Sequence, residues 1–282
     1  LSKLVKKKIT VCLSGDGGDE LFGGYNRYLF ASRLKKIFLF FPYFLRKPLS
    51  ELMLKIKPNS YDKFFSLFGK KIHNNFNGDK VQKFMEILKI KDFKSIYSYL
   101  LSFFPREDIP LKFNFPAQKK LFEFNLEKEN FIEQMQLSDL SFYLPGDILT
   151  KVDRASMAHG LEIRVPFLDH RIIEFAFSIP LNMKIKNGQT KKILRNILYE
   201  KIEPKYINRP KMGFAIPLVD WLRGPLKNWA IDTIHQGASK DDYVNFDKVK
   251  TILSEHMSGK RNWQNKLWTV LVYLIWKDKY IN

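Results

Sequence analysis

The chain has 282 residues, a length that fits one large domain or two joined ones. Hydrophobic residues make up 45% of it, so there is enough apolar material for a packed core, and disorder is excluded as the dominant state. The net charge of +19 on its own favours a polyanionic partner. Because Cys12 is the only cysteine, a disulfide scaffold and a cysteine-based zinc site are excluded, and a cytoplasmic location is expected.

A short β-branched run lies near the start of the chain. Residues Lys8–Leu13 place Ile9, Val11 and Leu13 on one side, which predicts a buried strand. The strand stops at a glycine-rich turn, after which apolar residues at helical spacing predict a helix over Asp19–Lys36. Since one strand is not stable alone, we expect its partners to precede the first residue, and we interpret the chain as beginning in mid-protein.

The rest of the chain is expected to be mostly helical. Its periodic segments, separated by Pro, Gly and Asn, are Tyr61–Phe68, Lys80–Lys89, Ser95–Phe104, Leu121–Leu144, Leu168–Phe177, Thr190–Tyr199, Leu218–His235, Phe246–Met257 and Asn262–Trp276. The apolar run Ile37–Leu45 contains Pro42 and is far shorter than the roughly 20 residues that span a bilayer. It predicts a buried helix with lysines on its wet face, and the alternative is an interfacial membrane helix. Pro105–Pro116 is the candidate connection between an α/β part and a helical part.

The turn Ser14–Glu20 (SGDGGDE) is the most informative stretch. Its glycines permit positive φ angles and let backbone N–H groups approach an anion, and the following helix would add its positive dipole. Asp16, Asp19 and Glu20 would repel a polyphosphate unless one or more of them hold Mg²⁺, which bridges carboxylate to phosphate. The turn therefore predicts a metal–nucleotide site; the alternative is that Asp16 or Asp19 only caps the helix.

Three stretches carry a family resemblance, in the same order along the chain. SGDGGDELFGGY (Ser14–Tyr25), LPGDILTKVDRASMAHGLEIRVPFLDHR (Leu144–Arg171) and RPKMGF (Arg209–Phe214) resemble the signatures of the synthetase domain of glutamine-dependent asparagine synthetase. The resemblance runs from about Val11 to the C-terminus. It implies an α/β fold, part of a parallel-sheet ATP pyrophosphatase fold followed by a mostly helical C-terminal region.

The resemblance also implies a domain organisation. Residues 1–282 would be the C-terminal part of one synthetase domain, with the strand, glycine turn and helix of the nucleotide-binding core in 1–36 and a mostly helical portion in 37–282. The family's SGGxDS phosphate loop and its glutaminase domain are absent from this sequence. We therefore expect the chain to be inactive alone and, with an uncovered strand edge, prone to aggregate.

The activity that the resemblance implies needs ATP and Mg²⁺. The β-carboxylate of aspartate is activated to β-aspartyl-AMP with release of pyrophosphate, and ammonia, supplied from glutamine by the missing domain, displaces AMP to give asparagine. Neither nucleic acid nor a membrane is expected as a partner, and a homodimer of the intact enzyme is a further expectation. Three alternatives stay open: amidation of a sugar or other metabolite carboxylate, a basic nucleic-acid-binding domain, and an inactive homologue retained for partner binding.

The resemblance gives roles to residues of the turn. Ser14 and Gly15 match positions that contact the nucleotide, and Gly17 and Gly18 complete that cofactor-binding set. Asp19 matches a magnesium-associated carboxylate.

Two catalytic residues are implied. Asp16 matches an acidic position, glutamate in many relatives, that is linked to the ammonia step. Lys211 matches the lysine beside pyrophosphate and the intermediate, where a fixed cation stabilises developing negative charge. Lys151 and Asp153 are candidates for the aspartate or ammonia site.

The remaining polar residues have structural interpretations. Glu162, Arg164 and Asp169 are expected to be scaffold residues in a buried ionic lattice. His159 is interpreted as a core or hydrogen-bonding histidine, and Cys12 as a small buried side chain.

Overall fold

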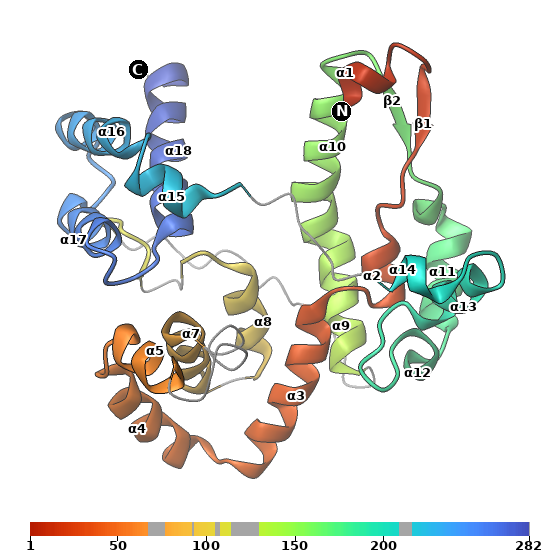
Figure 1. Ribbon diagram of the computed structural model, residues 1–282, viewed down its shortest axis with the longest axis horizontal. Helices are drawn as coiled ribbons and strands as arrows, with labels where there is room; N and C mark the ends of the chain where they lie inside the picture. The colour runs from red at the N-terminus through yellow and green to blue at the C-terminus, as the bar shows by residue number, and fades with distance from the viewer. Residues whose placement is uncertain (67–76, 92, 105–107, 114–129, 209–215, 282) are drawn as a thin grey trace. The chain divides into compact units, whose positions relative to one another are not determined.

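The chain divides into two compact units, each built from two separate stretches (Figure 1). The computed structural model describes residues 1–66, 77–91, 93–104, 108–113, 130–208 and 216–281. Unit 1 comprises residues 1–37 and 119–211, and unit 2 comprises 38–118 and 212–282. Residues 119–211, which the sequence placed with the helical portion, thus cluster with the first 37 residues.

Unit 1 contains a two-stranded parallel sheet. Strand β1 (Val11–Leu13) pairs with strand β2 (Glu162–Arg164), and the ladder continues where the N–H of Ser14 donates to the carbonyl of Arg164 at 2.9 Å. The sequence placed the partners of β1 ahead of the chain, but β2 lies within it. Strand β2 has only three residues, Glu-Ile-Arg, and this is too short a run to predict a strand from the sequence.

The apolar side of β1 is exposed, so the prediction of a buried strand is wrong. Ile9, Val11 and Leu13 are 44%, 38% and 69% exposed, and Cys12 is only partly buried. A two-stranded sheet offers little cover, and helix α10 (Thr150–Met157) packs mainly against β2. The alternation placed these residues on one side but could not tell whether that side is covered.

The rest of unit 1 is mostly helical in its described residues. Its helices are α1 (Ser2–Val5), α2 (Gly18–Phe22), α3 (Asn26–Phe40), α9 (Phe131–Ser138), the π-helix η2 (Asp139–Leu149), α10, the 3₁₀ turn η3 (Pro166–Leu168), α11 (His170–Ser178), α12 (Leu181–Lys184), α13 (Lys192–Tyr199) and α14 (Pro204–Ile207). Figure 1 shows α9 to α10 as one continuous green column. Leu21, Phe22, Ala176 and Ile179 form a buried cluster between α2 and the α11 segment.

The helix predicted over Asp19–Lys36 is interrupted. Gly23 has a φ of +68° and ends α2, and a Cβ there would lie 2.7 Å from Ile185 Cδ1. Only glycine combines this conformation with so close an approach. The apolar spacing continues through the interruption, which is why periodicity alone merged α2 with α3.

The described residues of unit 2 form helices and loops, with one isolated bridge between Leu111 and Val244. The helices are α4 (Tyr43–Leu54), α5 (Pro58–Ser66), α7 (Gly78–Leu88), α8 (Phe93–Leu101), α15 (Leu218–Arg223), α16 (Lys227–Lys240), α17 (Phe246–Met257) and α18 (Gln264–Tyr280). The last four helices form an apolar core around Leu222, Ile234, Val249 and Leu271. Helix α17 has the predicted bounds, whereas the predicted helix Leu218–His235 is divided into α15 and α16 near Gly224.

The prediction of a buried helix over Ile37–Leu45 is also wrong. Helix α3 ends at Phe40, Pro42 precedes α4, and the side chains of Phe40 and Phe44 are 88% and 72% exposed. Proline lacks the N–H that a continuing helix needs, so the chain breaks there. Within the described ranges, no helix has both the length and the apolar character needed to cross a membrane.

Candidate functional site

The Ser14–Glu20 turn directly follows β1. The Ser14 hydroxyl donates to Asp16 Oδ2 at 2.5 Å, and the Asp16 N–H donates back to Ser14 Oγ at 3.2 Å. The N–H of Gly18 donates to the carbonyl of Gly15 at 3.3 Å. These bonds fold the turn on itself and bring the predicted nucleotide-binding residues together with Asp16.

The glycines of the turn meet two different demands. Gly17 has a φ of +82°, and a Cβ there would lie 2.6 Å from Leu168 Cδ2. A Cβ on Gly15 would meet nothing within 4 Å. Gly17 is therefore required by backbone conformation and packing. The backbone at Gly15 borders open space, where a ligand is able to approach it.

Asp19 forms an ion pair that sequence analysis missed. Lys191 Nζ lies 3.0 Å from Asp19 Oδ2, and the two side chains are 26% and 29% exposed. A Cβ on Gly24 would lie 1.9 Å from Asp19 Oδ1 and 2.2 Å from Lys191 Cε, so a bare backbone at Gly24 makes room for the pair. The sequence around Lys191 looked like an ordinary basic start of a helix, which gives no signal of this contact.

Glu20, one of the three acids considered for magnesium, is buried away from solvent. It is 1% exposed, and the Tyr25 hydroxyl donates to its Oε1 at 2.7 Å. Burial raises the pKa of Glu20 above its ordinary value, and the hydrogen bond from Tyr25 opposes this shift. Helix α2 has only five residues, so the expected dipole contribution is small as well.

A second polar cluster, which the sequence analysis did not predict, lies around Asp139 and contacts the start of α3. Asp139, which is fully buried, accepts from Arg27 Nη2 at 2.7 Å and from the Tyr28 hydroxyl at 2.5 Å. The Arg27 guanidinium lies 3.7 Å from the ring centroid of Tyr25 and 4.7 Å from that of Tyr143. This network joins the start of α3 to the π-helix η2 and fixes the chain that follows the turn.

The buried ionic lattice predicted for the middle signature is wrong. Glu162 pairs with Arg164 at 2.7 Å, with both side chains more than half exposed. Asp169 pairs with Arg171 at 2.8 Å, and the Arg171 side chain is 78% exposed. The hydrogen bonds from Arg171 hold the pKa of Asp169 well below its usual range. Each pair joins residues two positions apart, so it is satisfied locally at the surface.

The other residues of that signature are solvent-facing. Lys151, Asp153 and His159 are exposed, which contradicts a core position for His159. The predicted catalytic Lys211 lies outside the described residues, as does the whole RPKMGF stretch. Whether Lys211 faces the turn therefore stays a prediction.

The donor set at the turn fits a magnesium ion bound together with a nucleotide. Among the described residues, no group of three or more His, Cys, Asp or Glu side chains is placed to hold a metal. Two carboxylates come from this segment: Asp16 is bonded to Ser14 next to Gly15, and Asp19, at the start of α2, pairs with Lys191. Mg²⁺ in nucleotide sites is usually held by one or two carboxylates, with phosphates and water completing its octahedron.

Comparison with known proteins identifies the family of this chain. The asparagine synthase family model matches residues 1–278, and the chain belongs to this family. Glutamine-hydrolyzing asparagine synthetase 1 of Bacillus subtilis is 34% identical over 278 residues, which cover 98% of this chain. The mouse glutamine-hydrolyzing asparagine synthetase is 31% identical over 158 residues, which cover 50% of this chain and 27% of the mouse protein.

The chain spans 41% of the length of the Bacillus relative. No solved structure matches the chain. The family resemblance predicted from the three signatures is thereby confirmed.

Proposed function

We propose that this chain forms part of an ATP-dependent amide-forming site of the asparagine synthetase type, on an ATP pyrophosphatase fold. The β-carboxylate of aspartate attacks the α-phosphorus of ATP, giving β-aspartyl-AMP and pyrophosphate. Ammonia then attacks the acyl carbon and AMP leaves, which yields asparagine. The observation that carries the proposal is the Ser14–Asp19 turn, with its carboxylates and its open backbone, at the end of a parallel strand in a chain of this family.

The turn is suited to bind the phosphates of ATP. A Cβ on Gly15 would meet nothing within 4 Å, so phosphate oxygens can reach the backbone there, while Gly17 and Gly18 shape the turn against Leu168 and Phe167. In this proposal the Ser14 hydroxyl, now bonded to Asp16, turns to donate to a phosphate oxygen. Asp16 stays beside the reacting carbon as the acidic group of the ammonia step.

Lys191 enters the proposal beside the predicted Lys211. Its Nζ lies 3.7 Å from the place where a Cβ on Gly18 would stand, so its charge is next to the phosphate-facing backbone. A fixed ammonium there stabilises the negative charge that gathers on the leaving pyrophosphate. Lys211 would supply a second cation from the RPKMGF stretch.

Asp19 is the residue that would hold Mg²⁺. When bound, the ion shields the charge of the phosphates and lowers the barrier to attack on phosphorus. The carboxylate of Asp19 is kept ready by Lys191, which orients it and balances its charge at 3.0 Å.

Nucleotide binding to the full chain tests the proposal without requiring turnover. We expect calorimetry to detect Mg·ATP binding, and Asp19→Asn to weaken it by about 10-fold or more, since one charged metal contact is lost. Asp232→Asn, which removes an exposed carboxylate of α16 in unit 2, is the matched control and should leave the affinity unchanged. Equal affinities for the two variants would contradict the assignment of Asp19.

A further inference from the structure

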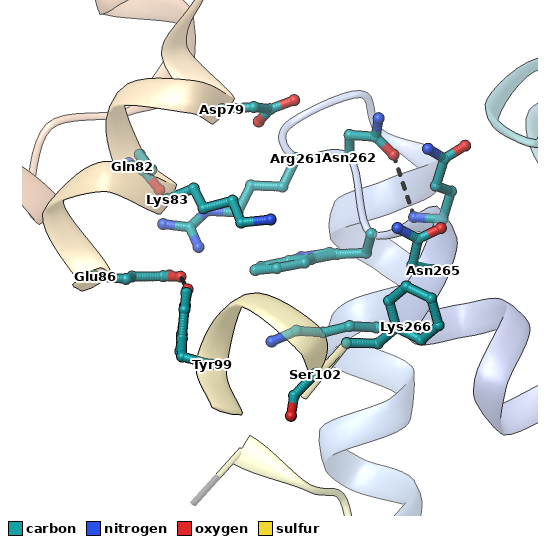
Figure 2. Close-up of a pocket in the computed structure, with 13 residues that line it drawn as sticks. Asp79, Gln82, Lys83, Glu86, Tyr99, Ser102, Arg261, Asn262, Asn265 and Lys266 are labelled. Carbon is teal, nitrogen blue, oxygen red and sulfur yellow. Dashed lines mark hydrogen bonds between the residues drawn. The ribbon is translucent and has the colours of Figure 1, made fainter. Parts of the chain in front are cut away.

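Unit 2 contains a cavity that the proposed reaction does not use. Its volume is about 230 Å³, and it lies between α7, the end of α8 and the loop that leads into α18 (Figure 2). None of the described residues of the glycine turn belongs to this unit. Ligand pockets usually measure about 300–1,000 Å³, so this smaller cavity suits only a small ligand.

Three cationic side chains from separate segments line this cavity. Figure 2 shows the ends of Lys83, on α7, and Lys266, on α18, directed into it, with Arg261 of the loop beside Lys83. Lys266 is paired with Asp108 at 3.2 Å. In the described part of the chain, neither Lys83 nor Arg261 forms an ion pair, so two charges are available to an incoming anion.

The indole of Trp263 holds two of these cations in place. Arg261 Cζ lies 5.1 Å and Lys266 Nζ lies 4.4 Å from its ring centroid, within the range of cation–π attraction. The ring is itself anchored, because its Nε1–H donates to Glu255 Oε2 at 2.8 Å. The backbone N–H of Trp263 donates to His256 Nδ1 at 3.1 Å. The cationic wall is therefore organised before any ligand arrives.

The acidic residues of the cavity are already engaged. Glu86 accepts a hydrogen bond from the Tyr99 hydroxyl. Desolvation raises the pKa of Asp79, and the charges of Arg261 and Arg223 act in the opposite direction. These acids reduce the positive charge of the cavity, but within the described residues neither of them forms an ion pair with Lys83 or Arg261.

One neutral acceptor in the lining has an unmet hydrogen bond. Gln82 is 5% exposed, and its Nε2 donates to the carbonyl of Ile56 at 2.8 Å. Its Oε1 accepts from no described residue. This oxygen is itself buried, so a ligand in the cavity does not reach it unless the side chain moves. The amides of Asn262 and Asn265, which also line the cavity, are suited to the hydroxyls of a ligand.

We propose that this cavity binds a small phosphorylated sugar or polyol. Lys83 and Arg261 hold the phosphate, because the ammonium and the forked guanidinium together match a dianionic group. The side-chain amides of Asn262 and Asn265 bond the hydroxyls of the ligand. The site is independent of the glycine turn and does not depend on the function proposed for it.

Calorimetry on the full chain tests this site with glucose 6-phosphate, glycerol 3-phosphate, glucose and inorganic phosphate as probes. We expect at least one of the two phosphorylated probes to bind about 10-fold more tightly than inorganic phosphate, and glucose to show no measurable binding. Lys83→Ala should weaken binding by about 10-fold, the loss expected for one charge-assisted contact. Lys89→Ala removes an equal charge at the end of the same helix, outside the cavity, and should change affinity less than about 2-fold.

Lys83 is exposed, so the variant is expected to fold, and its melting temperature should match that of Lys89→Ala. The proposal would be overturned if neither phosphorylated probe binds, or if inorganic phosphate binds as tightly as both of them. Equal affinities of the Lys83→Ala and Lys89→Ala variants would also overturn it.

Discussion

The two units of this chain are stabilised by different kinds of contact. In unit 1, the paired charges of Asp139 with Arg27 and of Asp19 with Lys191 join segments that are far apart in the sequence. In unit 2, Leu222, Ile234 and Leu271 are buried between helices that follow one another along the chain. The candidate site therefore lies in the unit whose polar residues are held by long-range contacts. The apolar core of unit 2 lies between helices that local periodicity is enough to predict.

The largest effect should come from breaking the buried ion pair of unit 1. Asp139→Asn leaves the Arg27 guanidinium without its charge partner in a largely buried position, and we expect a loss of about 3–5 kcal/mol in the free energy of unfolding. Urea unfolding measures this. Asp169→Asn removes an equal charge from an exposed pair and should leave the midpoint almost unchanged. Similar midpoints for both variants would show that burial does not distinguish the two pairs.

The apolar core of unit 2 should respond to lost volume. Leu271 is 0% exposed, and Leu271→Ala is expected to cost about 2–5 kcal/mol through lost burial and the cavity that remains. Leu13→Ala in unit 1 makes the same change at a side chain that is 69% exposed, and should cost less than about 0.5 kcal/mol. A large effect of Leu13→Ala, measured by urea unfolding, would mean that the apolar side of β1 is covered in solution.

Unit 2 also contains a neutral buried histidine that should make its stability depend on pH. Burial, assisted by the charge of Arg223, lowers the pKa of His256 from 6.5 to about 4. The unfolded chain takes up this proton near pH 6.5 and the folded chain only near pH 4. Stability is therefore full above pH 6.5 and falls by up to about 3 kcal/mol as the pH drops to 4.

Unfolding measured between pH 7 and pH 4 tests the role of His256. His256→Asn places an amide oxygen where Nδ1 accepts the Trp263 N–H, and should remove this part of the pH dependence. His235→Asn, at an exposed position, should retain it. Parallel pH profiles for the two variants would exclude His256 as the cause.

The smallest structural change concerns the space around Asp19. A Cβ on Gly24 would overlap Asp19 Oδ1 and Lys191 Cε. We therefore expect Gly24→Ala to lower the free energy of unfolding by about 1–3 kcal/mol and also to weaken Mg·ATP binding. Gly146→Ala places a methyl group where nothing lies within 4 Å and is the control. If Gly24→Ala destabilises the chain but binds Mg·ATP normally, the pair matters for folding and not for the nucleotide.

Features with a local cause could be predicted from the sequence. The bounds of α17 follow from apolar periodicity within Phe246–Met257, and the turn after β1 follows from its glycines. The family resemblance followed from the three signatures, because they are long and occur in order.

Features that depend on distant contacts could not be predicted. The pairing of Lys191 with Asp19 requires the path of the chain between them, and a lysine in a basic sequence gives no separate signal. Glu20 and Asp19 are adjacent and chemically alike, yet Glu20 is buried against Tyr25 and Asp19 pairs with Lys191. The prediction that β1 is buried was wrong for a related reason: alternation shows which residues share a side of a strand but not what covers that side.

The most direct test of the account is to locate the bound metal nucleotide on the chain. Fe²⁺ replaces Mg²⁺ in the presence of ATP, and added ascorbate and peroxide then generate radicals that cleave the backbone close to the ion. If the turn holds the metal nucleotide, cleavage will depend on ATP and fall within Ser14–Glu20. Excess Mg²⁺ will suppress this cleavage, and Asp19→Asn will abolish it. Cleavage confined to other segments, or cleavage at the turn that does not require ATP, would contradict it.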